Sequence, residues 1–395
     1  MRTVRCDGSP EQAAELVAAL GAALDGGPAV RPVGPVPAGD PAGTPAEQTA
    51  VVVATSGSSG EPKLVELAGP ALRASATATA ARLGGPARWL LALPAEHVAG
   101  VQVIVRALLA GAEPGLQDLR GGFRPGDFAD ATARLGPGRR CTSLVPTQLL
   151  RLLDGGGAPL DALRGYAAVL VGGAALDPGL RARAEAAGVR VVASYGMSET
   201  SGGCVYDGVP LDGVLVELAE DPTGMRDSHD EDVRLAGTGG GRILLAGPTL
   251  ASGYLGRPDD TATAFAGGWF RTGDIGRWVD GRLEVLGRAD DVIVTGGEKV
   301  APAAVERALS AQPGVHAACV VGLPDAEWGQ IVAAVVVRDA SAPGHDGLRH
   351  AVRDALGRAA VPRRLLDLPA LPLRGIGKLD RRAVTRLFTA TPPIG

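Results

Sequence analysis

The stretch that indicates the fold reads Val51-Val-Val-Ala-Thr55-Ser-Gly-Ser-Ser-Gly60-Glu-Pro-Lys63. Its consecutive valines predict a buried strand, because β-branched side chains pack well on a pleated surface. The strand runs into glycines and small hydroxyl residues, whose backbone N–H groups can approach phosphate oxygens. It is not a Walker A loop, because Glu61-Pro62 separates Gly60 from Lys63. The segment predicts a phosphate-binding loop at the end of a strand, and a solvated linker is the alternative.

Apolar runs alternate with stretches of helical spacing on both sides of this loop. We expect a first helix over about Pro10–Leu24, followed by a Pro/Gly-rich connector over residues 26–45. The predicted strands are Val51–Val53, Trp89–Leu93, Ala167–Val171 and Val189–Ala193. The predicted helices are Ala71–Leu83, Gln102–Ala110, Thr147–Leu153 and Pro178–Ala187. Strand–helix alternation at this spacing favours α/β layers with much parallel sheet.

The texture changes after about Asp207, where glycines punctuate short strands and Asp280-Gly281 signals a hairpin turn. These strands are predicted over Gly213–Leu218, Arg242–Ala246, Arg277–Val279 and Arg282–Val285. The last hundred residues predict a β-α-β-β-α module over Val292–Val294, Ala303–Ala311, His316–Leu323, Ile331–Val337 and Leu348–Ala359. We therefore expect an α/β fold: a large N-terminal domain of layered α/β sheets with a β-rich subdomain, residues 1–288, and a small α+β C-terminal domain, residues 289–395.

Composition excludes several classes of protein. At 395 residues the chain is long enough for two domains, and 46% hydrophobic content is typical of a globular protein. A net charge of −4 and the lack of a basic stripe with interleaved aromatics argue against nucleic-acid binding. The longest apolar runs are too short for a membrane span, and the start lacks a signal-peptide core. The scattered cysteines indicate unpaired thiols, so we expect a cytoplasmic protein, and a homo-oligomer stays open.

The chain has 39 basic residues of the Lys and Arg types, yet only Lys63, Lys299 and Lys378 are lysines. Each of the three lies in a glycine-bearing motif. A compact ammonium suits a single phosphate oxygen or a reacting carboxylate better than the wide guanidinium fork does. Chance placement in loops is the alternative for each lysine taken alone.

The motifs that follow, in order, are Ser194-Tyr-Gly-Met-Ser-Glu-Thr200, Gly268-Trp-Phe-Arg-Thr-Gly-Asp274, Gly287-Arg-Ala-Asp-Asp291, Gly296-Gly-Glu-Lys299 and Gly375-Ile-Gly-Lys378. With the phosphate loop, they make the chain resemble the adenylate-forming acyl-CoA synthetase superfamily from residue 51 to residue 380. The compact length and Leu93-Pro-Ala-Glu-His97-Val-Ala-Gly100 resemble the o-succinylbenzoate–CoA ligases of menaquinone synthesis. The resemblance implies an enzyme that activates a carboxylic acid with ATP and Mg²⁺ as acyl-AMP and transfers the acyl group to coenzyme A.

The resemblance also implies roles for residues of the nucleotide site. Glu199 would hold Mg²⁺, Ser198 would contact the α-phosphate, and Asp274 would bind the ribose hydroxyls with Arg288 nearby. The adenine would lie between the segment Gly172, Gly173, Ala174 and the ring of Tyr195, with Gly196 and Thr200 in the same motif. The β- and γ-phosphates would be held by Thr55, Ser56, Gly57, Ser58, Ser59, Gly60 and Lys63. Each has a structural alternative: Tyr195 a core residue, Asp274 a turn residue, Arg288 a surface charge, and Glu199 an acid at a helix N-terminus.

The same resemblance assigns residues to both half-reactions and to the acyl pocket. Lys378 would stabilise charge as the carboxylate attacks the α-phosphorus. The small domain would then swing about the hinge residue Asp290 and present Gly296, Gly297 and Lys299 toward CoA. The acyl pocket would be lined by His97, Gln102, Gly202 and Gly203, although a lone His is more often structural. The alternatives are a stand-alone adenylating enzyme or acyl-CoA ligase for another aryl or short-chain acid, and a non-catalytic nucleotide-binding homologue. A mere binder would need neither Glu199 nor Lys378.

Overall fold

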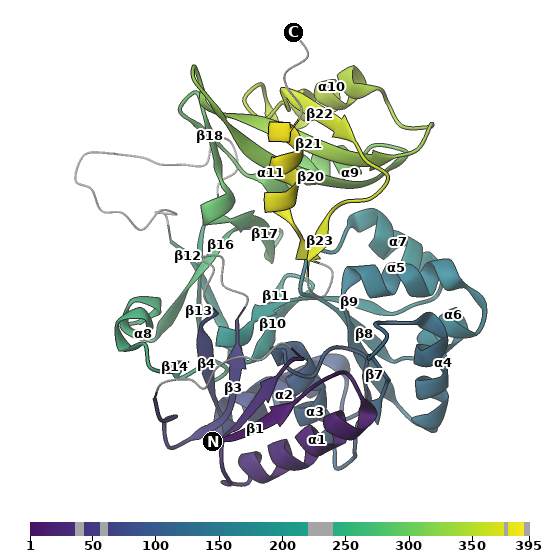
Figure 1. Ribbon diagram of the computed structural model, residues 1–395, viewed down its shortest axis with the longest axis vertical. Coiled ribbons are helices and arrows are strands. Elements are labelled where there is room, and N and C mark those ends of the chain that lie inside the picture. The colour runs from purple at the N-terminus through teal and green to yellow at the C-terminus, as the bar shows by residue number, and fades with distance from the viewer. Residues whose placement is uncertain (36–42, 56–61, 220–239, 375–377, 391–395) are drawn as a thin grey trace. The chain divides into compact units, whose positions relative to one another are not determined.

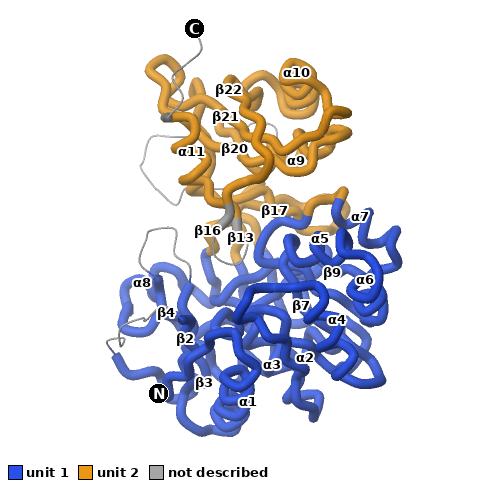
Figure 2. The backbone as a smooth tube through the Cα atoms, turned by 45° about the vertical axis from the view of Figure 1, so that its right-hand side comes forward, with its two compact units in different colours: residues 1–176, 180–216, 245–271 blue, residues 177–179, 217–244, 272–395 orange. Residues whose placement is uncertain are grey.

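The computed structural model describes residues 1–35, 43–55, 62–219, 240–374 and 378–390. The chain forms two compact units (Figure 2). Unit 1 comprises Met1–Leu176, Leu180–Val216 and Leu245–Arg271, and unit 2 comprises Asp177–Gly179, Glu217–Leu244 and Thr272–Gly395. The helices are α1 (Pro10–Leu24), α2 (Gly69–Leu83), α3 (Val98–Leu109), α4 (Pro125–Arg134), α5 (Pro146–Gly155), α6 (Gly157–Arg164), α7 (Pro178–Ala186), α8 (Pro258–Ala264), α9 (Pro302–Ser310), α10 (His345–Leu356) and α11 (Arg381–Ala390).

Unit 1 contains a sheet in the order β1 (Arg2–Arg5), β2 (Val30–Val33), β3 (Thr49–Ala54), β4 (Leu64–Ala68) and β14 (Gly253–Tyr254) (Figure 1). The three valines of β3 have no solvent exposure, which confirms the predicted buried strand. Strands β3 and β4 are antiparallel neighbours, so the chain between them must reverse direction. In the chain the predicted phosphate loop lies between these two strands, and of its described residues Thr55 N donates to Lys63 O at 2.8 Å.

A second sheet of unit 1 has the order β11 (Val209–Pro210), β10 (Gly202–Tyr206), β9 (Val191–Met197), β8 (Ala168–Val171), β7 (Arg140–Leu144), β5 (Arg88–Leu91) and β6 (Gly115–Leu116). Strands from β6 to β9 are parallel, as the strand–helix alternation predicted. Phe128 of α4, Leu149 of α5 and Leu163 of α6 pack in one core with Val169 and Val171 of β8. Ligands bind outside the carboxyl ends of parallel strands, so the ends of β8 and β9 are the first place to look for a site.

A third sheet has the order β12 (Leu215–Ala219), β13 (Gly241–Ala246), β16 (Trp269–Val279) and β15 (Phe265–Ala266), and β17 (Arg282–Arg288) pairs with β16. Asp280 and Gly281 both have positive φ, 49° and 72°, which confirms the predicted hairpin turn. The limits of the two units fall within β12, β13 and β16. The boundary between residues 288 and 289 stays a prediction.

The rest of unit 2 is a sheet of β19 (Glu298–Val300), β18 (Ile293–Thr295), β21 (Gly329–Arg338) and β20 (Val315–Asp325), with β22 (Arg364–Asp367) beside β21. Alternate residues of β20 face opposite sides, as the period of a strand requires. Val320 packs with Val305 of α9 and Leu348 of α10, whereas Val321 packs with Phe388 of α11. This arrangement confirms the predicted α+β module and adds α11, which was not predicted.

Two expectations about secondary structure were wrong. The predicted connector over residues 26–45 contains β2, a strand too short and too rich in proline to be recognised by periodicity. Strand β16 begins at Trp269, well before the predicted Arg277, because its glycines resemble a loop in sequence. Gly276 serves close packing instead: a Cβ there would lie 2.8 Å from Cδ1 of Ile243 and 3.1 Å from the main-chain oxygen of Glu284.

Candidate functional site

Glu199 lies in a three-residue 3-10 turn, Ser198–Thr200, that follows β9. Thr200, only 1% exposed, holds this turn in shape. Met197 N donates to Thr200 Oγ1 at 3.0 Å, and Thr200 Oγ1 donates to Gly202 O at 2.7 Å. Ser198 and Glu199 are therefore fixed, and partly exposed, at the carboxyl end of the parallel strands. The alternative role of Glu199, as an acid at a helix N-terminus, does not apply, because β10, not an α-helix, follows this turn.

Tyr254 holds the Glu199 side chain. Its hydroxyl donates to Glu199 Oε1 at 2.9 Å, and Ala251 N donates to Glu199 O at the same distance. Burial, together with the Glu199 carboxylate, raises the pKa of the Tyr254 hydroxyl above its ordinary value. The hydroxyl therefore stays protonated and acts as a donor.

Lys63 lies on the ring of the same tyrosine. Its Nζ is 4.6 Å from the centroid of the Tyr254 ring and 3.2 Å from Asp260 Oδ1. The Lys63 ammonium lowers the pKa of Asp260. The ion pair is partly exposed, so it contributes little to stability and phosphate oxygens can displace it. The other predicted phosphate-loop residues, Ser56, Gly57, Ser58, Ser59 and Gly60, lie outside the described residues.

The predicted adenine residues lie just after β8, at residues 172–174, and on β9, at Tyr195 and Gly196. A Cβ on Gly172 would lie 2.8 Å from Ser194 O, beside Tyr195, and Gly173 and Ala174 are exposed. A Cβ on Gly196 would lie 2.1 Å from Gly202 O, and one on Gly203 would lie 2.2 Å from Ser194 Oγ. These glycines allow β9 and β10 to approach closely, which is a structural reason for them in addition to any ligand contact.

The predicted acyl-pocket residues are brought together only in part. Gln102 of α3 is fully buried, and its Cγ would lie 3.0 Å from a Cβ on Gly202. Oε1 of Gln102 and Oγ of Ser201 are buried without a hydrogen-bond partner among the described residues. His97 is the N-cap residue of α3 and is half-buried. Unsatisfied buried polar atoms are costly, so this region offers bonds to a polar ligand or water.

Asp274 and Arg288 of unit 2 face each other across β16 and β17. Arg288 Nη1 is 3.9 Å from Asp274 Oδ1, and Nη2 is 3.2 Å from Asp290 Oδ2. The Asp274 side chain is 15% exposed and its N–H donates to Thr272 Oγ1 at 3.0 Å, so its position is fixed by the strand. Asp290 lies in the turn Ala289–Asp291 between β17 and β18.

The remaining predicted residues are in the C-terminal sheet of unit 2. Gly296 and Gly297 form the exposed turn between β18 and β19, with φ of 58° and 84°, and Lys299 follows in β19. The turn packs on Trp328, whose carbonyl accepts from Gly296 N at 3.0 Å. The backbone of Lys378 pairs with Arg374 in the hairpin of β23 (Leu373–Arg374) and β24 (Lys378–Leu379). The Lys378 side chain is outside the described part of the chain.

Arg381 anchors the segment that carries Lys378. Its guanidinium donates to both carboxylate oxygens of Glu306 in α9, the longer of the two bonds being 3.1 Å, and to Val320 O at 2.6 Å. Its Nε is 3.5 Å from Asp291 Oδ2, in the turn of Asp290. The sequence motif ended at Lys378 and did not reveal this contact.

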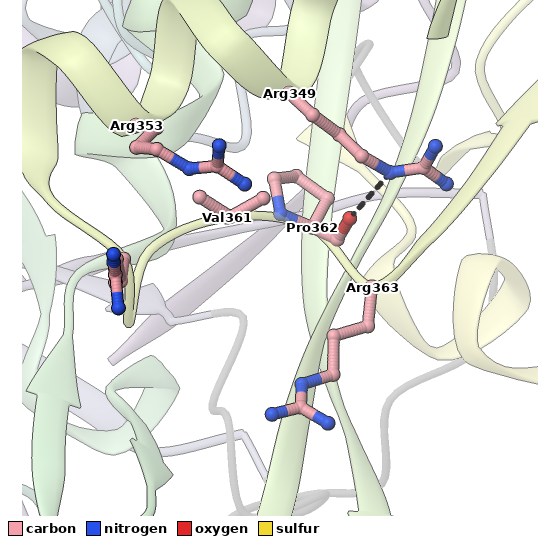
Figure 3. Close-up of a pocket in the computed structure, with 6 residues that line it drawn as sticks. Arg349, Arg353, Val361, Pro362 and Arg363 are labelled. Carbon is pink, nitrogen blue, oxygen red and sulfur yellow. Dashed lines mark hydrogen bonds between the residues drawn. The ribbon is translucent and has the colours of Figure 1, made fainter. Parts of the chain in front are cut away.

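Unit 2 also has a basic cavity of about 440 Å³, lined by Arg349, Arg353, Arg358, Val361, Pro362 and Arg363. Arg349 and Arg353 extend from α10 on either side of Val361 and Pro362, and Arg349 Nε donates to Pro362 O at 3.1 Å (Figure 3). Asp346, which is almost fully exposed, pairs with Arg349 at 3.0 Å. Among the described residues that line it, four are arginines and none is acidic, so the cavity suits an anion.

The residues present fit a magnesium ion that is held mainly by substrate. Within the described ranges no three His, Cys, Asp or Glu residues are grouped as metal ligands. Mg²⁺ commonly binds through one or two carboxylates plus phosphate oxygens rather than in an all-protein cage. Glu199 is a partly exposed carboxylate at the end of the parallel strands, oriented by the Tyr254 hydroxyl, and fits such a role.

The four cysteines are free thiols, as the sequence predicted. Among the described residues, Cys6, Cys141, Cys204 and Cys319 are buried and unpaired. Burial raises the pKa of Cys6, Cys204 and Cys319 to about 12, so these thiols are inert near neutral pH. No helix in the described part of the chain is long and apolar enough to cross a membrane.

Comparison with known proteins agrees with this fold and shows its family. The family model of the AMP-binding enzyme matches residues 5–255, and that of the AMP-binding enzyme C-terminal domain matches residues 304–378. The chain belongs to the AMP-binding enzyme family. The predicted resemblance to the adenylate-forming superfamily is therefore confirmed.

Three individual proteins that resemble the chain have names that state a substrate. The chain is 46% identical over 349 residues to a probable 2-succinylbenzoate–CoA ligase from Mycobacterium tuberculosis, covering 87% of this chain and 85% of the relative. It is 34% identical to a feruloyl-CoA synthase from Amycolatopsis, covering 87% and 70%. It resembles the structure of o-succinylbenzoate CoA synthetase from Bacillus subtilis in complex with the acyl-adenylate OSB-AMP, with 28% identity, a TM-score of 0.69 and coverage of 85% and 69%.

Proposed function

We propose that this protein is an AMP-forming acid–thiol ligase that converts o-succinylbenzoate, ATP and CoA into o-succinylbenzoyl-CoA, AMP and pyrophosphate. The main support for this class of reaction is that the Glu199 carboxylate and the Lys63 ammonium both contact one residue, Tyr254. A magnesium–triphosphate needs one hard oxygen ligand and one compact cation. The 46% identity to a probable 2-succinylbenzoate–CoA ligase supports the choice of acid.

In the first half-reaction, a carboxylate oxygen of the acid attacks the α-phosphorus of ATP and pyrophosphate leaves. Asp274 would accept hydrogen bonds from the ribose hydroxyls, and Lys63 would bind phosphate oxygens. Mg²⁺, when bound by Glu199 and the phosphates, would neutralise charge on the leaving group. Lys378 would stabilise the charge that develops at the α-phosphate. Removing one such preorganised contact typically reduces the rate by a factor of hundreds, about 3 kcal/mol.

In the second half-reaction, the CoA sulfur attacks the acyl carbon, the bond to the AMP oxygen breaks, and the thiol proton is released. No cation at the α-phosphate is needed for this step. We propose that unit 2 then uses the turn of Gly296, Gly297 and Lys299 on the CoA side, with Asp290 as the hinge. The exposed position of Asp290 in a short turn between two strands supports this role.

We assign the phosphate groups of CoA to the basic cavity of unit 2. Guanidinium groups bind phosphates bidentately and with charge assistance. Of the four arginines that line the cavity, only Arg349 has an ion-pair partner among the described residues, so Arg353, Arg358 and Arg363 have none there. Arg353→Gln is expected to raise the KM for CoA several-fold and to leave the KM for ATP unchanged. Equal KM values for CoA in variant and wild type would remove this assignment.

The acid has two carboxylates and a ketone, so its pocket must offer polar groups. The unpaired Oε1 of Gln102 and Oγ of Ser201 support a polar wall near Gly202. We place the reaction in the cytoplasm, where ATP and CoA are available. A ligase for another aryl acid is the second candidate, because a feruloyl-CoA synthase is 34% identical to the chain.

The test is a panel of acids assayed for thioester formation with ATP, Mg²⁺ and CoA. The panel contains o-succinylbenzoate, ferulate, benzoate and a medium-chain fatty acid. We expect o-succinylbenzoate to have the highest kcat/KM by at least about a hundredfold, because missing polar partners in a built pocket are heavily penalised. Efficient turnover of ferulate, together with no turnover of o-succinylbenzoate, would support the second candidate. Binding of ATP without thioester formation from any acid would contradict both.

A further inference from the structure

We propose that Tyr254 is a positioning residue for the metal and phosphate half of the active site. Its hydroxyl orients the Glu199 carboxylate, and its ring carries the Lys63 ammonium. The inference rests on the proposed roles of Glu199 and Lys63. It adds a residue that belongs to none of the motifs of the sequence and that does not itself touch the reacting atoms.

The segment of Tyr254 holds Glu199 at two points. Ala251 N binds the main-chain carbonyl of Glu199, and the Tyr254 hydroxyl binds its carboxylate, both at 2.9 Å. One contact fixes the backbone of the turn and the other fixes the side-chain rotamer. A glutamate on a short turn would otherwise sample several rotamers, and ordering such a side chain on binding weakens affinity by roughly two- to tenfold.

Tyr254 is itself rigid enough to act as a support. It is 7% exposed and lies in β14, opposite Val65 of β4. Its N–H donates to Thr261 Oγ1 at 2.9 Å, and its ring meets the edge of Phe265 with centroids 5.7 Å apart. The ring is therefore held by the backbone hydrogen bond of Tyr254, by the pairing of β14 with β4 and by packing against Phe265. It can transmit that position to the groups it contacts.

The pairing of β4 with β14 places Lys63 beside Tyr254. Lys63 directly precedes β4, and Leu255 N donates to Leu64 O at 2.8 Å, so β14 lies beside the end of the phosphate loop. The Lys63 Nζ is 4.6 Å from the centroid of the ring, a cation–π distance. Asp260 pairs with Lys63 from the following helix α8. The hydroxyl and the ring of Tyr254 thus have separable functions.

Two substitutions separate them. Tyr254→Phe keeps the ring and deletes the bond to Glu199, whereas Tyr254→Leu deletes both contacts. Glu199→Gln tests the metal ligand itself. The matched control is Tyr166→Phe, which deletes another buried tyrosine hydroxyl, bonded to Thr132 at 2.8 Å in the core of unit 1. Urea unfolding of each variant checks that the fold is kept.

The measurement is the affinity for ATP by calorimetry, with and without Mg²⁺ and with no acid present, so that no turnover occurs. We expect the affinity of Tyr254→Phe for metal-free ATP to stay within about twofold of the wild-type value. The factor by which Mg²⁺ increases the affinity for ATP is expected to be roughly tenfold smaller in this variant. Tyr254→Leu is expected to lose metal-free affinity several-fold as well, because Lys63 loses its support. Tyr166→Phe is expected to match the wild type in both.

The outcomes are distinguishable. If Glu199→Gln keeps the full effect of Mg²⁺, the proposed metal ligand is wrong. If Glu199→Gln loses that effect and Tyr254→Phe keeps it, the positioning role is overturned while the proposed function stands. If Tyr254→Leu and Tyr254→Phe bind metal-free ATP equally, the ring has no role in placing Lys63.

Discussion

Replacement of Glu306 by Gln tests whether the segment that carries Lys378 depends on an internal ion pair. Glu306 lies on α9 and binds the guanidinium of Arg381 with both carboxylate oxygens. It also accepts from Val320 N at 2.8 Å. Arg381 is the first residue of α11, three positions after Lys378. We expect Glu306→Gln to loosen α11 and to slow adenylate formation, because Lys378 then loses its support.

The magnitude follows from burial. Breaking one partner of a fully buried pair destabilises by about 3–5 kcal/mol, because the other charge is left uncompensated. Here the side chains of Arg381 and Glu306 are 27% and 15% exposed, so water relieves part of the penalty. Asp291, with an oxygen 3.5 Å from Arg381 Nε, remains as a second counter-charge. We therefore expect a loss of about 2 kcal/mol in the local stability of unit 2.

Hydrogen exchange on the full chain measures this loss directly. A change of about 2 kcal/mol corresponds to roughly thirtyfold faster exchange in the amides of α9 and α11, if they open together. Pyrophosphate exchange measures adenylate formation, and thioester formation from supplied acyl-adenylate measures the second half-reaction. The first is expected to fall and the second to persist.

The control is Asp161→Asn, which removes an ion pair to Arg164 whose side chains are 67% and 47% exposed. An exposed pair of this kind contributes about 0–1 kcal/mol, so exchange in α6 should hardly change. Unchanged exchange in α11 of Glu306→Gln would refute the anchoring argument. Equal losses in both half-reactions would show that the ion pair supports the whole unit rather than the Lys378 segment.

Three further predictions concern unit 2. Lys378→Ala is expected to reduce adenylate formation by a factor of hundreds or more and to spare thioester formation from supplied acyl-adenylate, since only the first step needs the cation; equal losses in stopped-flow assays of the two steps would contradict this role. Asp290→Pro is expected to do the reverse, because proline fixes φ near −65° and a hinge needs more than one backbone conformation; normal turnover would show that Asp290 is not the hinge. Arg338, with His345, lowers the pKa of Asp367 to about 2, so its contribution to stability is complete above the unfolded pKa of about 3.9 and is lost as pH falls toward 2. Because Asp367 is 45% exposed, Asp367→Asn should lower stability at pH 7 by less than about 1 kcal/mol and by progressively less as pH falls through about 2, measured by urea unfolding.

The elements that periodicity could predict are those whose signal is local. Helix α1 has the predicted bounds because Ser9 caps it and Pro10 starts it, and β3 is as buried as its valines indicate. The turn at Asp280-Gly281 follows from residues that tolerate positive φ. Short or proline-containing strands such as β2 have no such signal, because their neighbours in the sheet stabilise them.

By itself, the sequence determined the family and predicted which residues face phosphate, metal and ribose, because their motifs are continuous in the chain. Only the tertiary structure decided how those residues are held. Tyr254 reaches Glu199 across 55 positions, and Arg381 reaches Glu306 across 75. Contacts of this kind depend on which strands and helices become neighbours, and no local pattern of residues records that choice. The supports of the site, unlike its motifs, therefore become visible only when the chain has folded.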